Sequence, residues 1–232
     1  IQPPAIFIVG EVVRLREQLA WFDRTPLFGK RILVTRAREQ ASLLTGRLTH
    51  LGASCIEAPA IKLEPPETYE SVDQAIHTME QYQWIIFTSV NGVNAFFARL
   101  EHHGKDVRRL GQVKIAAIGV QTAARLRDYG IIADIVPVEF RAEGIVQALA
   151  PLIAPGSKVL IPRAAVARDL LPEKLGEMGA TVNVTPVYRT TQGVANAQQV
   201  VQEMAEGRID IVTFTSSSTV TNTVAMLGDN AI

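Results

Sequence analysis

The chain has 232 residues, of which 47% are hydrophobic and 20% charged, and this composition is that of a globular protein rather than a disordered one. Its 23 basic residues balance its 23 acidic ones, which excludes an overall positive field that would gather nucleic acid or an anionic membrane. The single cysteine, Cys55, excludes an internal disulfide, and neither a membrane-length apolar run nor a signal peptide is present, so we expect a soluble cytoplasmic protein.

The first 28 residues differ from the rest because they belong to no repeated pattern. Residues 5–9 predict a strand, residues 11–22 predict an amphipathic helix, and Arg24-Thr-Pro follows as a break. We expect this segment to be the end of a domain that lies upstream. Residues 30–61 then predict a βαβ unit, with a strand at 31–35, a helix at 40–51 that Gly52 ends, and a strand at 55–60.

Strands and helices alternate along the remainder of the chain, after a proline-containing linker at residues 63–68. Helices are predicted at residues 69–82, 92–103, 122–129, 143–153, 167–178, 195–206 and 218–227. Strands are predicted at residues 84–88, 113–118, 132–137, 158–161, 181–188 and 209–215. Because these strands are short and continuously apolar, they favour parallel sheets covered by helices on both faces, and the predicted fold class is α/β.

The order of elements repeats at an offset of 127 residues. Gly29-Lys-Arg-Ile-Leu-Val-Thr-Arg36 corresponds to Gly156-Ser-Lys-Val-Leu-Ile-Pro-Arg163 (36 + 127 = 163). Two similar α/β lobes are therefore expected, and a cleft between lobes is a preferred place for a small-molecule site. Counterparts of residues 113–118 and of Thr122 would lie past Ile232, so we expect the second repeat to be truncated at its C-terminus.

The same offset relates two hydroxyl-rich turns at the carboxyl ends of strands, where ligands of parallel α/β sheets bind. Their candidate binding residues are Thr88, Ser89 and Asn91 in the first turn and Ser216, Ser217 and Ser218 in the second. A helix N-terminus offers unpaired N–H groups and a partial positive charge, so either turn is suited to a carboxylate or a phosphate. Ordinary helix capping by the same hydroxyls is the alternative.

Four further residues at strand ends or helix starts are candidates for the site. Arg36 and Arg163 each follow the first strand of a repeat, where a guanidinium suits a carboxylate, although solvation at the surface is the alternative. Thr122 lies in a glycine-containing turn before a helix. Tyr188 ends a strand where the chain passes between lobes, and it is the best candidate for an acid; a half-buried structural tyrosine is the alternative.

Patterns for a metal, a nucleophile or a nucleotide are missing from the sequence. The four histidines, His50, His77, His102 and His103, lack the spacing of metal ligands, and we expect all four at the surface. Neither a G-x-S-x-G elbow nor a G-x-G-x-x-G loop follows a strand. An enzyme built from this chain would therefore work by positioning its substrate, with mild acid assistance, and we expect no metal and no cofactor.

Six short motifs follow one another in a fairly specific order and spacing. They are Ile32-Leu-Val-Thr-Arg36, Leu51-Gly-Ala53 with Pro59, Ile86-Phe-Thr-Ser-Val-Asn-Gly-Val93, Ala117-Ile-Gly119 with Thr122, Pro186-Val-Tyr188, and Phe214-Thr-Ser-Ser217. Together they resemble uroporphyrinogen-III synthase from Lys30 to the last residue. The first 28 residues, especially Pro4-Ala-Ile-Phe-Ile-Val-Gly-Glu-Val-Val-Arg-Leu-Arg16, resemble the C-terminal end of uroporphyrinogen-III C-methyltransferase, which is sometimes fused to the synthase in bacteria.

The resemblance implies two similar lobes joined by a two-stranded β-ladder. Residues 29–60 and 189–232 would form lobe 1, residues 61–188 would form lobe 2, and residues 1–28 would be the tail and linker of an upstream methyltransferase domain. The repeat by itself does not distinguish this exchange from two lobes in tandem. We expect a monomer, or a covalent fusion to the methyltransferase.

The resemblance also implies an activity in tetrapyrrole biosynthesis, the cyclisation of hydroxymethylbilane to uroporphyrinogen III with loss of water and inversion of ring D, without a cofactor. The substrate bears eight carboxylates, which the two turns and the arginines would bind. Tyr188 matches the family's tyrosine proposed to assist departure of the hydroxyl, and Thr122 matches a threonine of the cleft.

Two other functions remain open from the sequence. A two-lobed binding or sensor module for a polyanionic small molecule would use the same turns without catalysis. A flavodoxin-like nucleotide binder would copurify with a flavin, and its absorbance would reveal it.

Overall fold

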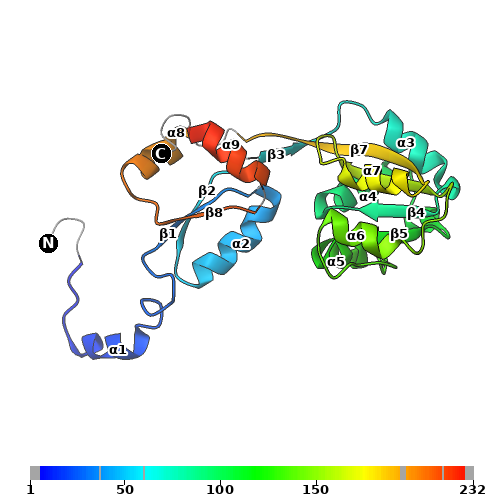
Figure 1. The fold of residues 1–232 in the computed structure, drawn as a ribbon. Coiled ribbons are helices and arrows are strands. Elements are labelled where there is room, and N and C mark those ends of the chain that lie inside the picture. The colour runs from blue at the N-terminus through cyan, green and yellow to red at the C-terminus, as the bar shows by residue number, and fades with distance from the viewer. Residues whose placement is uncertain (1–5, 37, 60, 194–196, 216, 228–232) are drawn as a thin grey trace. The chain divides into compact units, whose positions relative to one another are not determined.

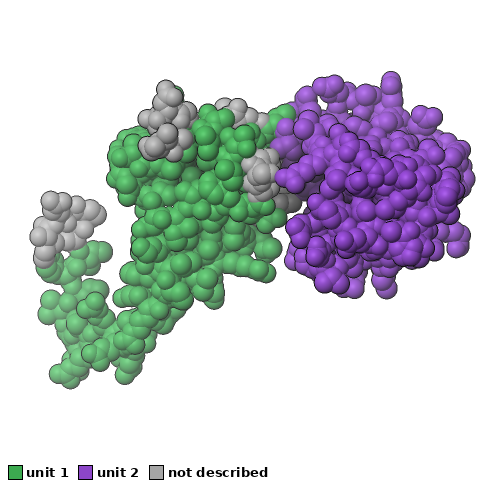
Figure 2. Space-filling view, viewed as in Figure 1, with its two compact units in different colours: residues 1–62, 191–232 green, residues 63–190 purple. Residues whose placement is uncertain are grey.

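The computed structural model describes residues 6–36, 38–59, 61–193, 197–215 and 217–227 (Figure 1). The chain divides into two compact units, Ile1–Lys62 with Thr191–Ile232 as unit 1 and Leu63–Thr190 as unit 2 (Figure 2). Unit 1 is therefore assembled from two separate stretches of the chain, and unit 2 from the continuous stretch between them. Each unit contains parallel strands flanked by helices, so the predicted α/β class is confirmed.

Unit 1 is built on a three-stranded sheet in the order β2-β1-β8, with parallel neighbours. The strands are β1 (Arg31–Val34), β2 (Ser54–Glu57) and β8 (Ile211–Thr213), and the flanking helices are α2 (Arg38–His50), α8 (Ala197–Ala205) and α9 (Ser217–Leu227). Ile32 and Val34 pack in one apolar cluster with Ala41 of α2, whereas Leu33 packs in another with Val200 of α8. Successive residues of β1 thus face opposite sides, and both faces of the sheet are covered.

Unit 2 is built on a five-stranded sheet in the order β3-β7-β6-β4-β5. The strands are β3 (Ile61–Glu64), β4 (Trp84–Phe87), β5 (Lys114–Ala117), β6 (Lys158–Ala164) and β7 (Thr181–Gln192). The helices are α3 (Glu70–His77), α4 (Val90–His102), α5 (Val120–Asp128), α6 (Ala142–Leu149) and α7 (Leu170–Glu177), with the 3-10 turns η2 (Met79–Gln81) and η3 (Val107–Leu110). The two boundaries between the units fall inside β3 and β7, which are neighbours in this sheet.

The core of unit 2 also lies on both faces of its sheet. Ile85 and Phe87 of β4 pack in one cluster with residues of α3, α4 and α5. Trp84 and Ile86, the alternate residues of the same strand, pack in a second cluster with residues of α6 and α7. All four side chains are buried, which explains why β4 is apolar without interruption.

The two sheets pair their strands in the same register. Pairs of the three-stranded sheet correspond to pairs of the five-stranded sheet when 127 is added to or subtracted from their numbers: Ile32↔Cys55 to Val159↔Val182, and Ile32↔Ile211 to Val159↔Trp84. The order β2-β1-β8 therefore corresponds to β7-β6-β4. In each sheet, two paired strands from one half of the sequence, β1 and β2 or β6 and β7, are joined by a strand from the other half, β8 or β4.

Gly52 ends α2 as the sequence predicts. Its φ is +94°, a conformation that favours glycine, and a Cβ at this position would lie 2.0 Å from Thr25 Oγ1. Gly179, its counterpart at offset 127, follows α7 with a φ of +88°. The two matched helices therefore stop at the same kind of left-handed residue.

Two predicted segments differ from the structure. Residues 132–137 do not form a strand; only Ile135 pairs, with Ala116, as an isolated bridge. Asp134 Oδ2 accepts from the backbone N of Ile115 at 2.7 Å, so a side chain takes a donor that a longer ladder would use. The predicted linker at 63–68 begins inside β3, which ends at Glu64 directly before Pro65, because a proline pair ends a ladder but permits a strand before it.

The N-terminal segment is less regular than predicted. Residues 6–9 form no strand, and Ala5 lies outside the described residues. The helix predicted at 11–22 is reduced to η1 (Glu11–Leu15) and α1 (Arg16–Leu19). Its apolar side chains have no core to cover, since Val12 is 56% and Leu19 is 63% exposed, and short helices without packing are marginal.

Candidate functional site

The turn between β4 and α4 is the best-defined part of the candidate site. Ser89 is the N-cap of α4, and its Oγ accepts a hydrogen bond from the backbone N of Gly92 at 2.9 Å. Thr88 and Asn91, the other predicted residues of the turn, are half-buried beside it. Helix capping is therefore a real function of Ser89, but its hydroxyl has a second contact.

That second contact joins Ser89 to Tyr188 of β7. The two hydroxyl oxygens lie 3.2 Å apart, and either can be the donor. Tyr188 is half-buried and packs against the cluster that contains Phe87 and Val187. The structure thus brings together two predicted residues that are 99 positions apart in the sequence, at the carboxyl edge of the five-stranded sheet.

The short distance between α4 and β6 depends on Gly92, which the sequence analysis did not single out. A Cβ on Gly92 would lie 3.0 Å from Pro162 O of β6 and 3.2 Å from Ser89 Oγ. Since β6 lies between β4 and β7, this close approach lets Ser89 reach Tyr188 across β6. The signal in the sequence was a glycine three residues after a capping serine.

Arg163 lies at the end of β6 and is only 8% exposed. Its Nη1 donates to Arg168 O at 2.7 Å, and its Nη2 donates to Asp169 Oδ1. Its Nε has no hydrogen-bond partner among the described residues. Arg163 is therefore a buried group bound to the loop of residues 165–169, and the surface alternative does not hold for it.

Thr122 is also buried near this edge. It is the third residue of α5, whose N-cap is Gly119, and it is 4% exposed. The backbone N of Ile118 donates to Phe87 O at 3.0 Å, which ties the end of β5 to the end of β4 directly before α5. Six predicted residues, Thr88, Ser89, Asn91, Thr122, Arg163 and Tyr188, therefore share the carboxyl edge of one sheet in unit 2.

Unit 1 contains the remaining predicted residues. Arg36 follows β1 and is half-buried. Ser216 lies outside the described residues, and Ser217 and Ser218 begin α9 with only their backbone described. Nearby, Thr35 Oγ1 donates to Thr213 O at 2.7 Å, so a buried hydroxyl ties the carboxyl ends of β1 and β8 together.

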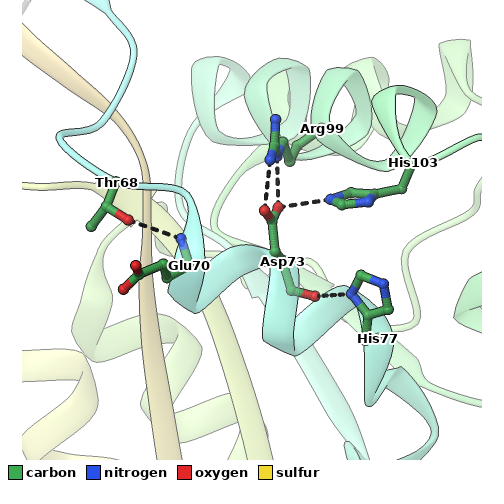
Figure 3. Close-up of polar contacts among 6 residues, drawn as sticks. All are labelled: Thr68, Glu70, Asp73, His77, Arg99 and His103. Carbon is green, nitrogen blue, oxygen red and sulfur yellow. Dashed lines mark hydrogen bonds and ion pairs between the residues drawn. The ribbon is translucent and has the colours of Figure 1, made fainter.

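A polar cluster, here called the Asp73 clamp, joins α3 to α4 (Figure 3). Asp73 accepts hydrogen bonds from Nε and Nη2 of Arg99, each at 2.6 Å, and lies 2.8 Å from His103 Nε2. The Arg99 guanidinium also lies 4.1 Å from the centre of the Tyr69 ring. The hydrogen bonds from Arg99 lower the pKa of Asp73 to about 2. The clamp fixes α4, the helix that Ser89 caps.

The histidine prediction is correct in part. His50, His77 and His102 are exposed, but His103 is half-buried and contacts Asp73. A histidine that ends a helix beside a carboxylate of the preceding helix leaves no signal in the local sequence, because the contact is tertiary.

The described part of the chain has neither a cluster of metal ligands nor a helix that could span a membrane. Within it, no three or more His, Cys, Asp or Glu side chains gather where they could hold a metal ion. None of the described helices is long and apolar enough to cross a bilayer. Cys55 is a half-buried residue of β2 that packs with Ile32, as expected for a small apolar strand residue.

The arrangement at this edge can bind an anion and supply a proton. The first turn of α4 directs backbone N–H groups and partial positive charge toward the edge where Thr88 and Ser89 lie. Tyr188 adds a phenolic hydroxyl that shares a hydrogen bond with the Ser89 hydroxyl. The combination suits an acidic small molecule that reacts with the help of a weak acid.

Comparisons with known proteins agree with one another. The sequence model of the family described as uroporphyrinogen-III synthase HemD matches residues 42–231. The porphyrin biosynthesis protein HemD of Ruminiclostridium josui is 36% identical over 229 residues, which are 99% of this chain and 45% of that protein. The uroporphyrinogen-III synthase of Synechococcus elongatus is 32% identical over 206 residues, which are 88% of this chain and 77% of that protein.

A solved structure shows the same fold. A crystal structure of mutant uroporphyrinogen III synthase from Thermus thermophilus superposes with a TM-score of 0.62 at 17% identity, covering 85% of this chain and 77% of that one. The chain spans less than half the length of the Ruminiclostridium josui relative. On the family match and the two relatives, this chain belongs to the uroporphyrinogen-III synthase family.

Proposed function

We propose that the chain catalyses the uroporphyrinogen-III synthase reaction, in which hydroxymethylbilane closes to uroporphyrinogen III with loss of water and inversion of ring D. Membership of the family supports the reaction. The observation that carries the proposal is the hydrogen bond between Tyr188 Oη and Ser89 Oγ at the carboxyl edge of the sheet, because it places a weak acid beside a helix N-terminus.

In the proposed mechanism, Tyr188 gives its proton to the departing hydroxyl. The C–O bond of the hydroxymethyl group breaks, and the oxygen leaves as water. The substituted carbon of ring D bonds to the remaining methylene carbon and forms a spiro intermediate. The bond from that ring carbon to its original bridging methylene then breaks, and this methylene bonds to the free ring D carbon, so that ring D is inverted. The proton that the closing pyrrole releases restores the acid, so no electron is gained or lost. Ser89 accepts from Tyr188 or donates to it, and so keeps the phenol oriented.

Binding of the substrate is proposed for the two turns and the arginines. Its carboxylates would meet the turn with Thr88, Ser89 and Asn91, and the turn with Ser216, Ser217 and Ser218. Arg36 and Thr122 complete the proposed set. Arg163 is buried, and its guanidinium donates to Arg168 O and to Asp169 Oδ1.

The test is an isomer assay. The chain is supplied with freshly generated hydroxymethylbilane, and the products are oxidised and separated into isomers I and III. A predominance of isomer III supports the proposal, because unaided closure gives only isomer I. A product made only of isomer I, with the substrate still bound, would instead favour the binding or sensor module.

The organisation of the longer protein is also a proposal. We propose that residues 1–28 are the tail of an upstream methyltransferase domain, that residues 29–60 and 189–232 form lobe 1, and that residues 61–188 form lobe 2. The unit boundaries after Lys62 and Thr190 support the lobes, and the shared pairing register supports the internal repeat. Coverage of 99% of this chain but 45% of its Ruminiclostridium josui relative supports a fusion.

Two further properties follow the composition. We propose a cytoplasmic location, because a single cysteine suits a reducing compartment. We also propose that the protein acts as a monomer or within a covalent fusion. The mass of the native polypeptide, measured by size exclusion with light scattering and by blotting, tests both the fusion and the monomer.

A further inference from the structure

We propose that Arg163 is a positioning residue that holds the loop of residues 165–169, and that Arg168 of this loop meets a carboxylate of the substrate. The proposal rests on the proposed function for the identity of the substrate. It gives the two arginines different roles: Arg163 is buried and bonds to the loop, whereas Arg168 is exposed and would contact the substrate.

The contacts of Arg163 point inward to the loop. Nη1 donates to the backbone O of Arg168 at 2.7 Å and Nη2 donates to the carboxylate of Asp169, so the guanidinium grips two successive residues. The Arg163 side chain is 10% exposed, whereas that of Asp169 is 66% exposed. A buried guanidinium that donates two hydrogen bonds to one loop fixes the position of that loop.

The loop is tied to the candidate acid from its other end. The backbone N of Ala165 donates to the backbone O of Tyr188 at 2.9 Å. Directly before it, the pairing of β6 with β7 changes register between Arg163 and Ala164, so that Ala164 lies opposite Tyr188. Such an irregularity re-aims a strand end, here at the edge where Tyr188 and Ser89 meet.

The rest of the loop faces solvent. Val166 is 92% exposed, and Arg168 is also an exposed residue. An exposed arginine on a loop held at both ends loses less freedom when it binds a carboxylate than one on an unrestrained loop. Arg168 therefore has the charge, the exposure and the preorganisation that a substrate contact needs, and Arg163 supplies the preorganisation.

The first experiment separates Arg168 from general surface charge. In the full chain, Arg168→Gln is expected to raise KM for hydroxymethylbilane about tenfold with kcat changed by less than about twofold, because a charge-assisted contact is lost and the acid is untouched. Arg127→Gln, which removes an exposed arginine of α5, is the matched control and is expected to leave KM unchanged. An Arg168→Gln variant with wild-type KM would overturn the proposal.

The second experiment tests whether Arg163 acts through the loop. Asp169→Ala removes one partner without uncapping α7, because the Asp169 side chain makes no capping hydrogen bond. We expect Asp169→Ala to raise KM, Asp169→Asn to restore most of the loss, and the double variant Arg168→Gln/Asp169→Ala to be no worse than Arg168→Gln. If the double variant instead showed the product of the two single increases in KM, the contact with Asp169 would act independently of Arg168. That outcome contradicts the proposal.

A readout without turnover separates this inference from the proposed function. If the wild-type chain forms no isomer III, the reaction assignment fails, yet hydrogen–deuterium exchange of peptides covering residues 165–169 still reports the hold by Arg163. Faster exchange in Arg163→Met, or in Asp169→Ala should the former not fold, supports the positioning role. Exchange equal to that of the wild type in a folded variant would refute it.

Discussion

The two units differ in chemistry where their sheets agree in geometry. Ser89 of unit 2 has Ser216 as its counterpart at offset 127 (89 + 127 = 216), so both units keep a serine at this turn. Tyr188 has Ile61 as its counterpart (188 − 127 = 61), so unit 1 lacks a hydroxyl there. The difference teaches that two sheets with the same pairing register can keep a serine at matched positions while a tyrosine stands at only one of a second matched pair.

The helices that cover the two sheets differ as well. Asp73, the centre of the clamp on α3, has Val200 of α8 as its counterpart (73 + 127 = 200). Val200 is fully buried in an apolar cluster, whereas Asp73 holds α4 through Arg99 and His103. Unit 2 thus fixes its helix pair with charges, and unit 1 packs the matching position with apolar atoms.

The largest expected effect comes from removing the hydroxyl of Tyr188, whose counterpart in unit 1 is Ile61. Tyr188→Phe should lower kcat for isomer III about 100-fold with little change in melting temperature, because the ring still packs and only the proton donor is lost. Initial rates from isomer separation measure it. Tyr129→Phe, which removes a hydroxyl from the C-cap residue of α5, serves as the control. Equal turnover of Tyr188→Phe and wild type would take Tyr188 out of the mechanism.

Gly92→Ala should have the next largest effect. A Cβ 3.0 Å from a backbone carbonyl of β6 forces α4 away, so we expect a loss of roughly 2–3 kcal/mol in the free energy of unfolding and a weaker Ser89–Tyr188 contact. Gly46→Ala in α2 of unit 1 is the matched control, because nothing lies within 4 Å of the added atom. Urea unfolding compares them, and a stabilised Gly92→Ala variant would contradict the close approach.

The Asp73 clamp makes a prediction about acid. The folded-state pKa of Asp73 is lowered from 3.8 to about 2, so its contribution is present above about pH 4 and is lost as the pH falls toward 2. Asp73→Asn should therefore cost roughly 2 kcal/mol at neutral pH, and the gap to wild type should close between pH 4 and pH 2. Unfolding curves at several pH values test this, and a gap independent of pH would refute the assignment.

The smallest expected effect lies in unit 1. Thr35→Val removes the buried hydrogen bond to Thr213 O and should cost about 1 kcal/mol, since one neutral hydrogen bond is lost between β1 and β8. Thr213→Val, whose hydroxyl donates to Leu33 O over 3.2 Å, should cost less. Thermal melting ranks the pair. A larger drop in melting temperature for Thr213→Val than for Thr35→Val would show that the shorter hydrogen bond is not the more stabilising one.

Most helices and strands could be predicted because they follow from local patterns. The apolar run of β4 and the periodic apolar residues of α4 are each visible in a short stretch of sequence. Their observed positions therefore agree with the predicted ones to within a few residues. The strand at 132–137 could not be excluded locally, because its failure depends on the Asp134 side chain reaching Ile115. The helix predicted at residues 11–22 is shorter than expected, because its apolar side chains are exposed. A local pattern does not tell whether a core is there to cover them.

The sequence predicted which residues are candidates for the site, but not the contacts between them. Serine at a turn and tyrosine at a strand end are visible in the sequence, but their hydrogen bond joins positions 99 apart and needs the sheet order to be known. The burial of Arg163 was not predictable, because arginine is rarely buried and its partner Asp169 looks like an ordinary helix start.

The order of strands in unit 1 has a consequence during synthesis on the ribosome. The central strand β1 is made early, but its neighbour β8 emerges only after all of unit 2, residues 63–190, has left the exit tunnel. Until then one edge of β1, rich in Ile32, Leu33 and Val34, has no strand beside it. A nascent chain that stalls in this interval would present the unpaired backbone groups of an edge strand to chaperones, whereas unit 2 can already be complete.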